Sequence, residues 1–285
     1  METIMNKYIL TSAHVAAYTQ FLRREERSSS TVEKYIRDAS RFVLWLEGRE
    51  VTKDTVIEWK DHLLAQGKTP ATVNGKLSAL NGLFRFLGWE GCKARFIKIQ
   101  RKVFRETSRE LTKEEYGKLL RAASDLCLNW LGLLMETICS TGIRVSEVQY
   151  VTVEAARAGR ADIALKGKVR TILLSGKLCR KLLKYAGKQK IASGEIFLAK
   201  SGTGLSRHQI WKAMKRLCAC AHVDHSKVFP HNLRHLFAVT FYKVTHDIVK
   251  LADVLGHSSV NTTRIYLLTT CSEHLRQLER LGLVV

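Results

Sequence analysis

The stretch from residue 230 to residue 266, PHNLRHLFAVTFYKVTHDIVKLADVLGHSSVNTTRIY, decides how the C-terminal half of the chain is organised. Its leading proline suits the first turn of a helix, because the amide that proline lacks would have no partner there. Gly256 follows an apolar run at helical spacing, and glycine most readily adopts the left-handed conformation that ends a helix. The pattern predicts helices over about 230–243, 247–255, 262–268 and 272–281.

Upstream of this stretch, apolar residues recur at helical spacing on both sides of one region in which apolar and polar residues alternate. Thr112 and Glu115 have the spacing of a capping box, which starts a helix. Between residues 162 and 174 apolar and polar residues alternate around Lys166-Gly-Lys168, which predicts a β-hairpin with lysines at its tip. The other elements expected here are helical structure to about 140, a short strand over 196–198 and a helix over 206–222.

The first ninety or so residues have helical spacing throughout. Thr52 and Thr69 stand where helices are expected to begin, and Pro70 occupies a first-turn position. Gly48 and Gly67 stand where helices are expected to end. The sequence therefore predicts a compact four-helix unit, with helices over about 12–25, 30–48, 52–67 and 69–87.

A basic stretch from Lys93 to Arg109 joins the two helical regions and contains seven Lys or Arg residues and one acidic residue, Glu106. A solvated run of charge is the usual interpretation of such a segment. Here apolar residues are interleaved with the cations, which favours an extended linker with one edge on phosphates and the other on protein. The cations expected to contact DNA are Lys93, Arg95, Lys98, Arg101 and Lys102.

The charge of the whole chain indicates a polyanionic partner. Lys and Arg total 47 against 26 Asp and Glu, a formal net charge of +21. Such an excess repels itself unless a polyanion neutralises it, so nucleic acid is the expected partner. The sequence has no apolar run of about 18 residues and no secretory cleavage pattern, which indicates a cytoplasmic protein without a membrane span. Its seven scattered cysteines fit buried reduced thiols better than disulfides or a zinc site.

Four short segments and one tyrosine stand out in the second region: TGIRVSE (141–147), KGK (166–168), HNLRH (231–235), LGH (255–257) and Tyr266. Each alone has an ordinary explanation. Arg144 could pair with Glu147 at the start of a helix, and two histidines one turn apart could bind a metal ion. HNLRH lacks the glutamate of HExxH and contains a permanent cation, Arg234, so no metal site is expected.

In this order and at this spacing, the segments resemble the active site of the tyrosine recombinases, the family that includes phage integrases and Xer-type resolvases. The resemblance extends over nearly the whole chain. It implies a mainly α fold with a small β-sheet, in which a helical core-binding domain (1–92), a basic linker (93–109) and a mixed α/β catalytic domain (110–285) follow one another. It implies no metal and no cofactor.

The resemblance also implies a role for each site residue. Tyr266 is the expected nucleophile, which attacks a DNA phosphorus and forms a 3′-phosphotyrosyl link. Arg144 and Arg234 are expected to bind the non-bridging oxygens, because a guanidinium offers a planar fork of donors and keeps its charge. His231 is a candidate acceptor of the tyrosine proton, and His257 is expected to donate a hydrogen bond to the phosphate.

A lysine of the predicted hairpin is expected to protonate the departing 5′-oxygen, because an alkoxide is a poor leaving group. The turn is one residue shorter than the form common in the family, so Lys166 is the first choice and Lys168 the alternative. Lys168 and Arg170 are also expected to contact DNA.

The implied function is site-specific recombination of double-stranded DNA by a tetramer, for integration or excision of a mobile element or for resolution. In the family a C-terminal segment docks on a neighbouring protomer, and the last predicted helix carries Leu275, Leu278 and Leu281 at helical spacing. Two alternatives remain. A type IB topoisomerase-like enzyme relaxes DNA as a single subunit with similar groups, and a DNA-binding accessory protein would have no activity.

Overall fold

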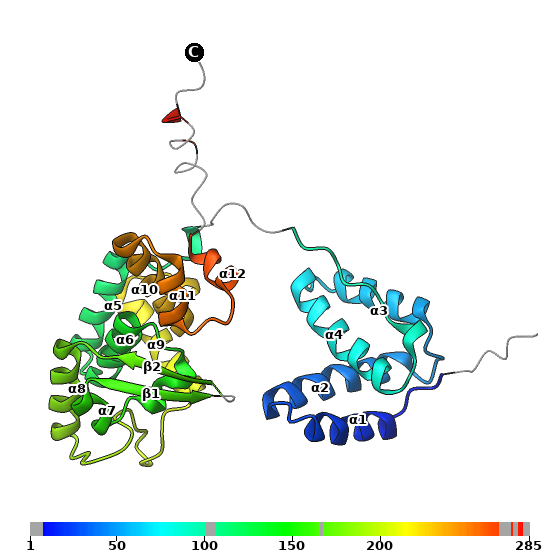
Figure 1. Cartoon of the computed structure of the whole chain (residues 1–285), viewed down its shortest axis with the longest axis horizontal. Coiled ribbons are helices and arrows are strands. Elements are labelled where there is room, and N and C mark those ends of the chain that lie inside the picture. The colour runs from blue at the N-terminus through cyan, green and yellow to red at the C-terminus, as the bar shows by residue number, and fades with distance from the viewer. Residues whose placement is uncertain (1–7, 101–106, 166–167, 268–274, 276–278, 282–285) are drawn as a thin grey trace, which may run out of the picture. The chain divides into compact units, whose positions relative to one another are not determined.

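The computed structural model divides the chain into two units, Met1–Arg101 and Lys102–Val285 (Figure 1), and each has its own apolar core. It describes residues 8–100, 107–165, 168–267, 275 and 279–281. Arg101, Lys102 and Lys166 lie outside the described residues. Among those that are described, no helix is long and apolar enough to cross a membrane.

The first unit contains the four predicted helices: α1 (Ser12–Arg24), α2 (Ser29–Leu46), α3 (Lys53–Ala65) and α4 (Pro70–Phe86). Two of them begin with the caps that the sequence indicates. The hydroxyls of Thr52 and Thr69 accept hydrogen bonds from the amides three residues later, at 3.2 and 3.3 Å. Each bond satisfies one of the amides that the first turn of a helix leaves without a partner.

Aromatic rings fill the core of the first unit. Phe42 of α2 meets Trp59 of α3 edge to face, with 5.1 Å between ring centroids, and meets Phe84 of α4 at 6.2 Å. All three side chains are buried. Burying a large apolar side chain contributes about 1.5–3 kcal/mol, so these rings are a main cohesive force between α2, α3 and α4.

The beginning of the basic stretch packs against α4. The Asn81 side-chain amide donates to the Ala94 carbonyl at 3.0 Å, and the Asn74 side chain exchanges two hydrogen bonds with the backbone of Ile97. Ala94 is buried, whereas Arg95 and Lys98 are exposed. Two asparagines of α4 therefore fix the backbone of this segment while two of its cations face solvent. Lys93 forms an ion pair with Glu90.

The second unit is mostly helical, with a two-stranded antiparallel sheet, and the predicted fold class is confirmed (Figure 1). Its elements are α5 (Lys113–Asp125), α6 (Asn129–Thr141), α7 (Val153–Ala158), β1 (Arg160–Leu165), β2 (Lys168–Leu173), α8 (Gly176–Lys188), α9 (Arg207–Ala221), α10 (Pro230–Thr245), α11 (Ile248–Leu255) and α12 (Val260–Thr263). β1 and β2 form the predicted hairpin, with Ile163 opposite Arg170.

The expectation of a short strand over 196–198 is wrong. Isolated bridges pair Glu195, directly before this segment, with Thr152, and Leu198, its last residue, with Gly204, and neither extends into a ladder. Ile196 and Phe197 are buried because the segment crosses the core of the second unit, so their apolar character reflects burial and not strand pairing.

The cysteines of the described residues form no disulfide. Cys92, Cys179 and Cys218 are buried, as expected. The expectation is wrong for Cys127 and Cys220, which are exposed. Cys127 lies in the turn after α5 with a positive φ of 54°. Cys220 lies two residues after Cys218 on α9, so it points away from the core.

A buried ion pair between α2 and α4 gives a test of what stabilises the first unit. Lys76 Nζ lies 2.8 Å from Asp38 Oδ1, and the two side chains are 9% and 5% exposed. Lys76→Met leaves a buried carboxylate without its partner, which costs roughly 3–5 kcal/mol. We expect this loss in chemical denaturation of the full chain, together with faster hydrogen exchange of the α2 and α4 amides.

The matched control is Glu58→Gln, which breaks the exposed pair of Arg49 and Glu58, where both side chains are about half exposed. Exposed pairs contribute at most about 1 kcal/mol, so this variant should unfold almost as the wild type does. Equal losses of unfolding free energy in Lys76→Met and Glu58→Gln would show that burial of the pair of Lys76 and Asp38 does not matter.

Candidate active site

A pocket of about 570 Å³ in the second unit gathers five of the six residues expected to be catalytic: Arg144, His231, Arg234, His257 and Tyr266. They come from four places in the chain, which are the turn after α6, the first turns of α10, the end of α11 and the segment after α12. The sixth, Lys166, lies outside the described residues, and of Lys168 only the backbone is described, as the first residue of β2.

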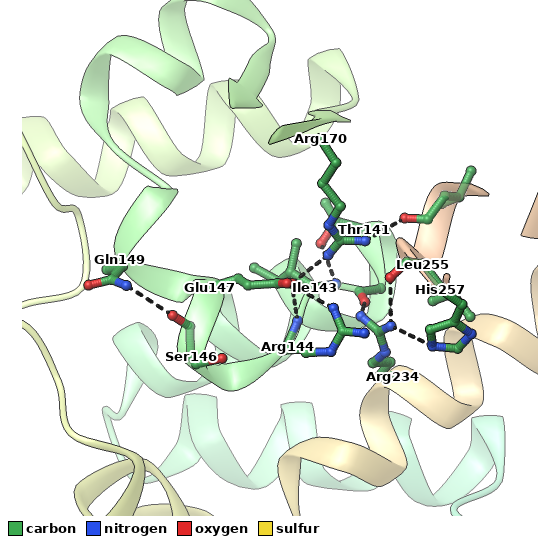
Figure 2. Close-up of polar contacts among 12 residues, drawn as sticks. Thr141, Ile143, Arg144, Ser146, Glu147, Gln149, Arg170, Arg234, Leu255 and His257 are labelled. Carbon is green, nitrogen blue, oxygen red and sulfur yellow. Dashed lines mark hydrogen bonds and ion pairs between the residues drawn. The ribbon is translucent and has the colours of Figure 1, made fainter. Parts of the chain in front are cut away.

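Arg234 lies at the bottom of this pocket, where it is 2% exposed. Its guanidinium donates to the carbonyl of Gly142, which ends α6, and to the carbonyl of Leu255, the last residue of α11, at 2.8 Å (Figure 2). The last carbonyls of a helix have no partner within it and carry the negative end of the helix dipole. Two helix ends therefore stabilise one buried cation. Burial lowers the pKa of Arg234 to about 10, and the nearby Arg144 cation adds to this effect, so Arg234 stays charged at neutral pH.

Two glycines make this arrangement possible. Gly142 and Gly256 have φ values of 68° and 63°, in the left-handed region that ends α6 and α11. A Cβ at Gly142 would lie 2.5 Å from the ring of Phe237, and one at Gly256 would lie 2.5 Å from the side chain of Arg170. Both positions thus need glycine for space as well as for conformation.

Glu147 connects Arg144, which lines the pocket, to a further arginine, Arg170 (Figure 2). Its carboxylate is 2% exposed, accepts from Arg144 Nη1 at 3.0 Å and pairs with Arg170 Nη2. Arg170 Nη1 also donates to the Val254 carbonyl at 2.8 Å. The structure therefore places Arg170, a residue expected to contact DNA, inside a network that fixes Glu147. Arg144 keeps 42% of its side chain exposed and faces the pocket.

His257 is hydrogen-bonded on both ring nitrogens. Nε2 lies 3.0 Å from Arg234 Nη2, and Nδ1 lies 2.8 Å from Thr263 Oγ1. A guanidinium can only donate, so Nε2 must accept, and the proton of a neutral ring is then on Nδ1. Burial lowers the pKa of His257 to about 4, with the Arg234 cation as the next cause. In this structure His257 therefore orients Arg234 through Nε2.

His231 lies in the first turn of α10, one turn before Arg234. Although part of its ring is exposed, burial and the Arg234 and Arg144 cations lower its pKa. The ring is therefore neutral at neutral pH and can accept a proton. Its position in the pocket makes it available to a group there that must lose one.

Tyr266 lies in a single turn of 3-10 helix, Arg264–Leu267, directly after α12. Its side chain is 3% exposed. The ring stacks on His257, with 6.1 Å between centroids and 16° between planes, and meets His235 edge to face at 5.1 Å and 70°. The expected helix over 262–268 begins two residues earlier and tightens to 3-10 geometry before the tyrosine.

Several functional residues were missed by sequence reasoning. Arg207 and Trp211 of α9 line the pocket, and Trp211 is 44% exposed, with Lys215 Nζ 5.4 Å from its ring centroid. A signal existed, since Arg207, Trp211 and Lys215 recur every four residues and so share one helix face. Thr263 has no such signal, and of the two partners of Glu147 the sequence indicates only Arg144, because Arg170 is distant in sequence.

The family model described as the phage integrase family matches residues 109–272, more than half of the chain. The chain belongs to the phage integrase family. The model of the phage integrase N-terminal SAM-like domain matches residues 15–91, so both units have counterparts in the family.

Curated relatives and solved structures agree with membership of the phage integrase family. The tyrosine recombinase XerA of Pyrococcus furiosus is 28% identical over 98% of each chain, and XerD of Vibrio cholerae is 27% identical over 88% of this chain and 89% of its own. A structure of the XerH site-specific recombinase bound to its difH substrate has a TM-score of 0.71 at 21% identity, covering 96% of this chain and 85% of that chain. A lambda integrase dimer bound to a core site has a TM-score of 0.72 at 20% identity, covering 92% of this chain and 77% of that chain. The two structural likenesses concern the fold.

A metal ion has no evident place at this site. Among the residues that the structure describes, no group of three or more His, Cys, Asp and Glu side chains could hold one. The polar groups of the pocket are instead cations and neutral imidazoles, which suit an anionic ligand.

The bonds of His257 predict its titration. Since its pKa is lowered to about 4, the ring should stay neutral, with the proton on Nδ1, from pH 8 down to about pH 5. Nuclear magnetic resonance of ¹⁵N-histidine in the full chain measures both the pKa and the tautomer. A midpoint near the ordinary value of 6.5, or a proton on Nε2, would contradict this assignment.

The same shift affects stability. Between about pH 4 and pH 6.5 the unfolded chain binds a proton at His257 that the folded chain does not, so this group makes stability rise with pH over that window. His257→Gln should remove this contribution, and its unfolding midpoint should depend less steeply on pH than that of the wild type.

Proposed function

We propose that this chain is a site-specific DNA recombinase that cuts and rejoins strands through a 3′-phosphotyrosyl intermediate on Tyr266. The observation that supports this most is that Arg144 and Arg234, ninety positions apart, line the same pocket as Tyr266. Family membership agrees with it, since the matched relatives are named tyrosine recombinases.

The chemistry explains why two guanidiniums belong beside the tyrosine. Attack on a phosphodiester passes through a five-coordinate phosphorane that carries about one more negative charge than the ground state, so fixed cations favour the transition state selectively. Each preorganised donor contributes roughly 3–4 kcal/mol in comparable sites. Arg234 is fixed by two carbonyls and His257, and Arg144 by Glu147, so neither guanidinium needs to reorganise during the reaction.

Two proton transfers complete each strand cut. A phenol must lose its proton to attack phosphorus, so Tyr266 needs an acceptor, a role that fits the neutral His231. The 5′-oxygen that leaves needs a donor, and a lysine of the β1–β2 hairpin, Lys166 or else Lys168, takes this role. The phosphotyrosyl link conserves the energy of the broken phosphodiester, so the strand can be rejoined without ATP.

The DNA contacts extend beyond the pocket. We assign 1–92 to a helical DNA-binding domain, 93–109 to a basic linker and 110–285 to the catalytic domain. Exposed Arg95 and Lys98, on a segment fixed by Asn74 and Asn81, are suited to duplex phosphates, and Lys93, Arg101 and Lys102 complete the proposed set. The matched structures of XerH and lambda integrase were both determined with DNA bound.

Recovery of a covalent DNA adduct tests the proposed nucleophile. The full chain is incubated with a random-sequence duplex library, and adducts that resist detergent but not protease are collected and sequenced. Tyr266→Phe should give no adduct, because it lacks the attacking oxygen, and Arg234→Ala should form adduct about 10²–10³ times more slowly. Tyr185→Phe, which alters a half-buried tyrosine of α8 away from the pocket, is the matched control.

Adduct from Tyr266→Phe at the wild-type rate would assign the attack to another residue. No adduct from the wild type would favour the alternative of an inactive accessory protein. Strand exchange between two marked copies of the recovered site separates a recombinase from a topoisomerase-like enzyme, which would relax supercoiled DNA without exchange.

We further propose that the chain assembles as a tetramer on DNA, with the C-terminal segment after residue 267 docking on a neighbouring copy. An apolar groove between α5, α6 and α10 suits this segment, whose sequence carries leucines at helical spacing. The groove is lined by Tyr116, Cys139, Leu236, Phe237, Phe241 and Val244, among others. Val244 is 79% exposed.

Truncation after Cys271 and the substitution Val244→Asp should both prevent the tetramer, the second because a charge in an apolar interface is costly to desolvate. Analytical ultracentrifugation of each variant with the recovered site measures the assembly. Val249→Asp, on an exposed valine of α11 outside the groove, is the control and should assemble normally. A truncated chain that still forms tetramers would rule out this docking.

A further inference from the structure

The Tyr266 ring has a neighbour that takes no part in the chemistry above, His235. It follows Arg234 on α10, and its ring meets that of Tyr266 edge to face at 5.1 Å. His235 is not among the residues that line the pocket with the arginines. Its contact with the Tyr266 ring is edge-to-face packing.

His235 also reaches the segment by which the chain enters the second unit. Its Nε2 lies 3.8 Å from Glu110 Oε1, and the two side chains are 17% and 14% exposed. One turn earlier on α10, the side-chain amide of Asn232 donates to the Arg109 carbonyl at 2.7 Å and to the Lys227 carbonyl at 2.8 Å. Asn232 thus fixes the backbone at Arg109, and the Glu110 carboxylate lies beside the His235 ring.

We propose that Glu110 and His235 form a positioning pair that sets the orientation of the Tyr266 ring for attack. This deepens the proposed function and rests on it, because it treats Tyr266 as the nucleophile. Glu110 fixes the imidazole of His235, and the imidazole edge limits rotation of the phenol. His257, fixed by Arg234 and Thr263, contacts the same ring by stacking.

The local structure explains why the tyrosine needs such contacts. Tyr266 lies in a four-residue 3-10 turn, which provides fewer and poorer backbone hydrogen bonds than an α-helix. Its side chain therefore depends on its neighbours for orientation. Attack requires the phenol oxygen about 3–3.5 Å from phosphorus and in line, and a misplacement of about 1 Å can cost about 100-fold in rate.

Single-turnover cleavage of the DNA site recovered from the wild-type adduct is the first measurement. His235→Ala should lower the rate of adduct formation by about 100-fold and leave DNA affinity unchanged, because it releases the ring without removing a phosphate contact. His235→Phe keeps an aromatic edge against Tyr266 but has no nitrogen to pair with Glu110, so it should recover part of that loss.

A double-mutant cycle separates this role from a merely structural one. Glu110→Gln should slow cleavage in the wild type and should add nothing in the His235→Phe background, because the pair is already broken there. Glu114→Gln, which removes the same charge from the exposed first turn of α5, is the matched control and should cleave at the wild-type rate. Equal effects of Glu110→Gln in both backgrounds, or wild-type cleavage by His235→Ala, would overturn the proposal.

A measurement on the free protein keeps this test separate from that of the proposed function. With 3-fluorotyrosine at position 266, the ¹⁹F resonance should be shifted or broadened by His235→Ala and by Glu110→Gln, but not by Glu114→Gln. Unchanged resonances would overturn the positioning role even where the wild type cleaves DNA. Failure of the wild type to form an adduct would overturn the recombinase assignment and leave this resonance to report on the pair.

Discussion

One cation depends on the ends of two helices, and the rest of the site depends on that cation. Arg234 is buried, and its charge is stabilised by the Gly142 and Leu255 carbonyls, which end α6 and α11. These helix ends are fixed in turn by glycines with positive φ that no larger residue could replace without a clash. Since His257 directly follows the second of these glycines, the same turn places the imidazole that binds Arg234 and stacks on Tyr266.

Positive charge exceeds negative charge around the pocket. Glu147 is a single buried carboxylate between Arg144 and Arg170, and Arg234 is paired with neutral carbonyls and a neutral imidazole. The described residues around the pocket therefore carry a net positive charge, and lowered pKa values keep His231 and His257 from adding to it. Such a site favours a ligand that gains negative charge as it reacts, because its dipoles and cations are already oriented.

The sequence predicts most of the architecture, because helix starts and ends are local signals. Thr52, Thr69 and Gly256 each mark a boundary that the structure contains. Local signals do not predict burial that depends on residues distant in the sequence. Ile196 and Phe197 look like a strand and are core residues of a coil segment, because a short apolar run has no periodicity of its own.

The candidate site shows the same difference between local signals and contacts of distant residues. The tyrosine and both arginines can be named from motifs that lie within a few residues, but nothing local links Arg170 to Glu147 or His235 to Glu110. The most direct test of the account is a crystal structure of the full chain with vanadate and a nicked duplex of its own site. We predict vanadium bonded to the Tyr266 oxygen, with the guanidiniums of Arg144 and Arg234 both on its equatorial oxygens. Vanadate bound elsewhere, or touching only one of these arginines, would contradict it.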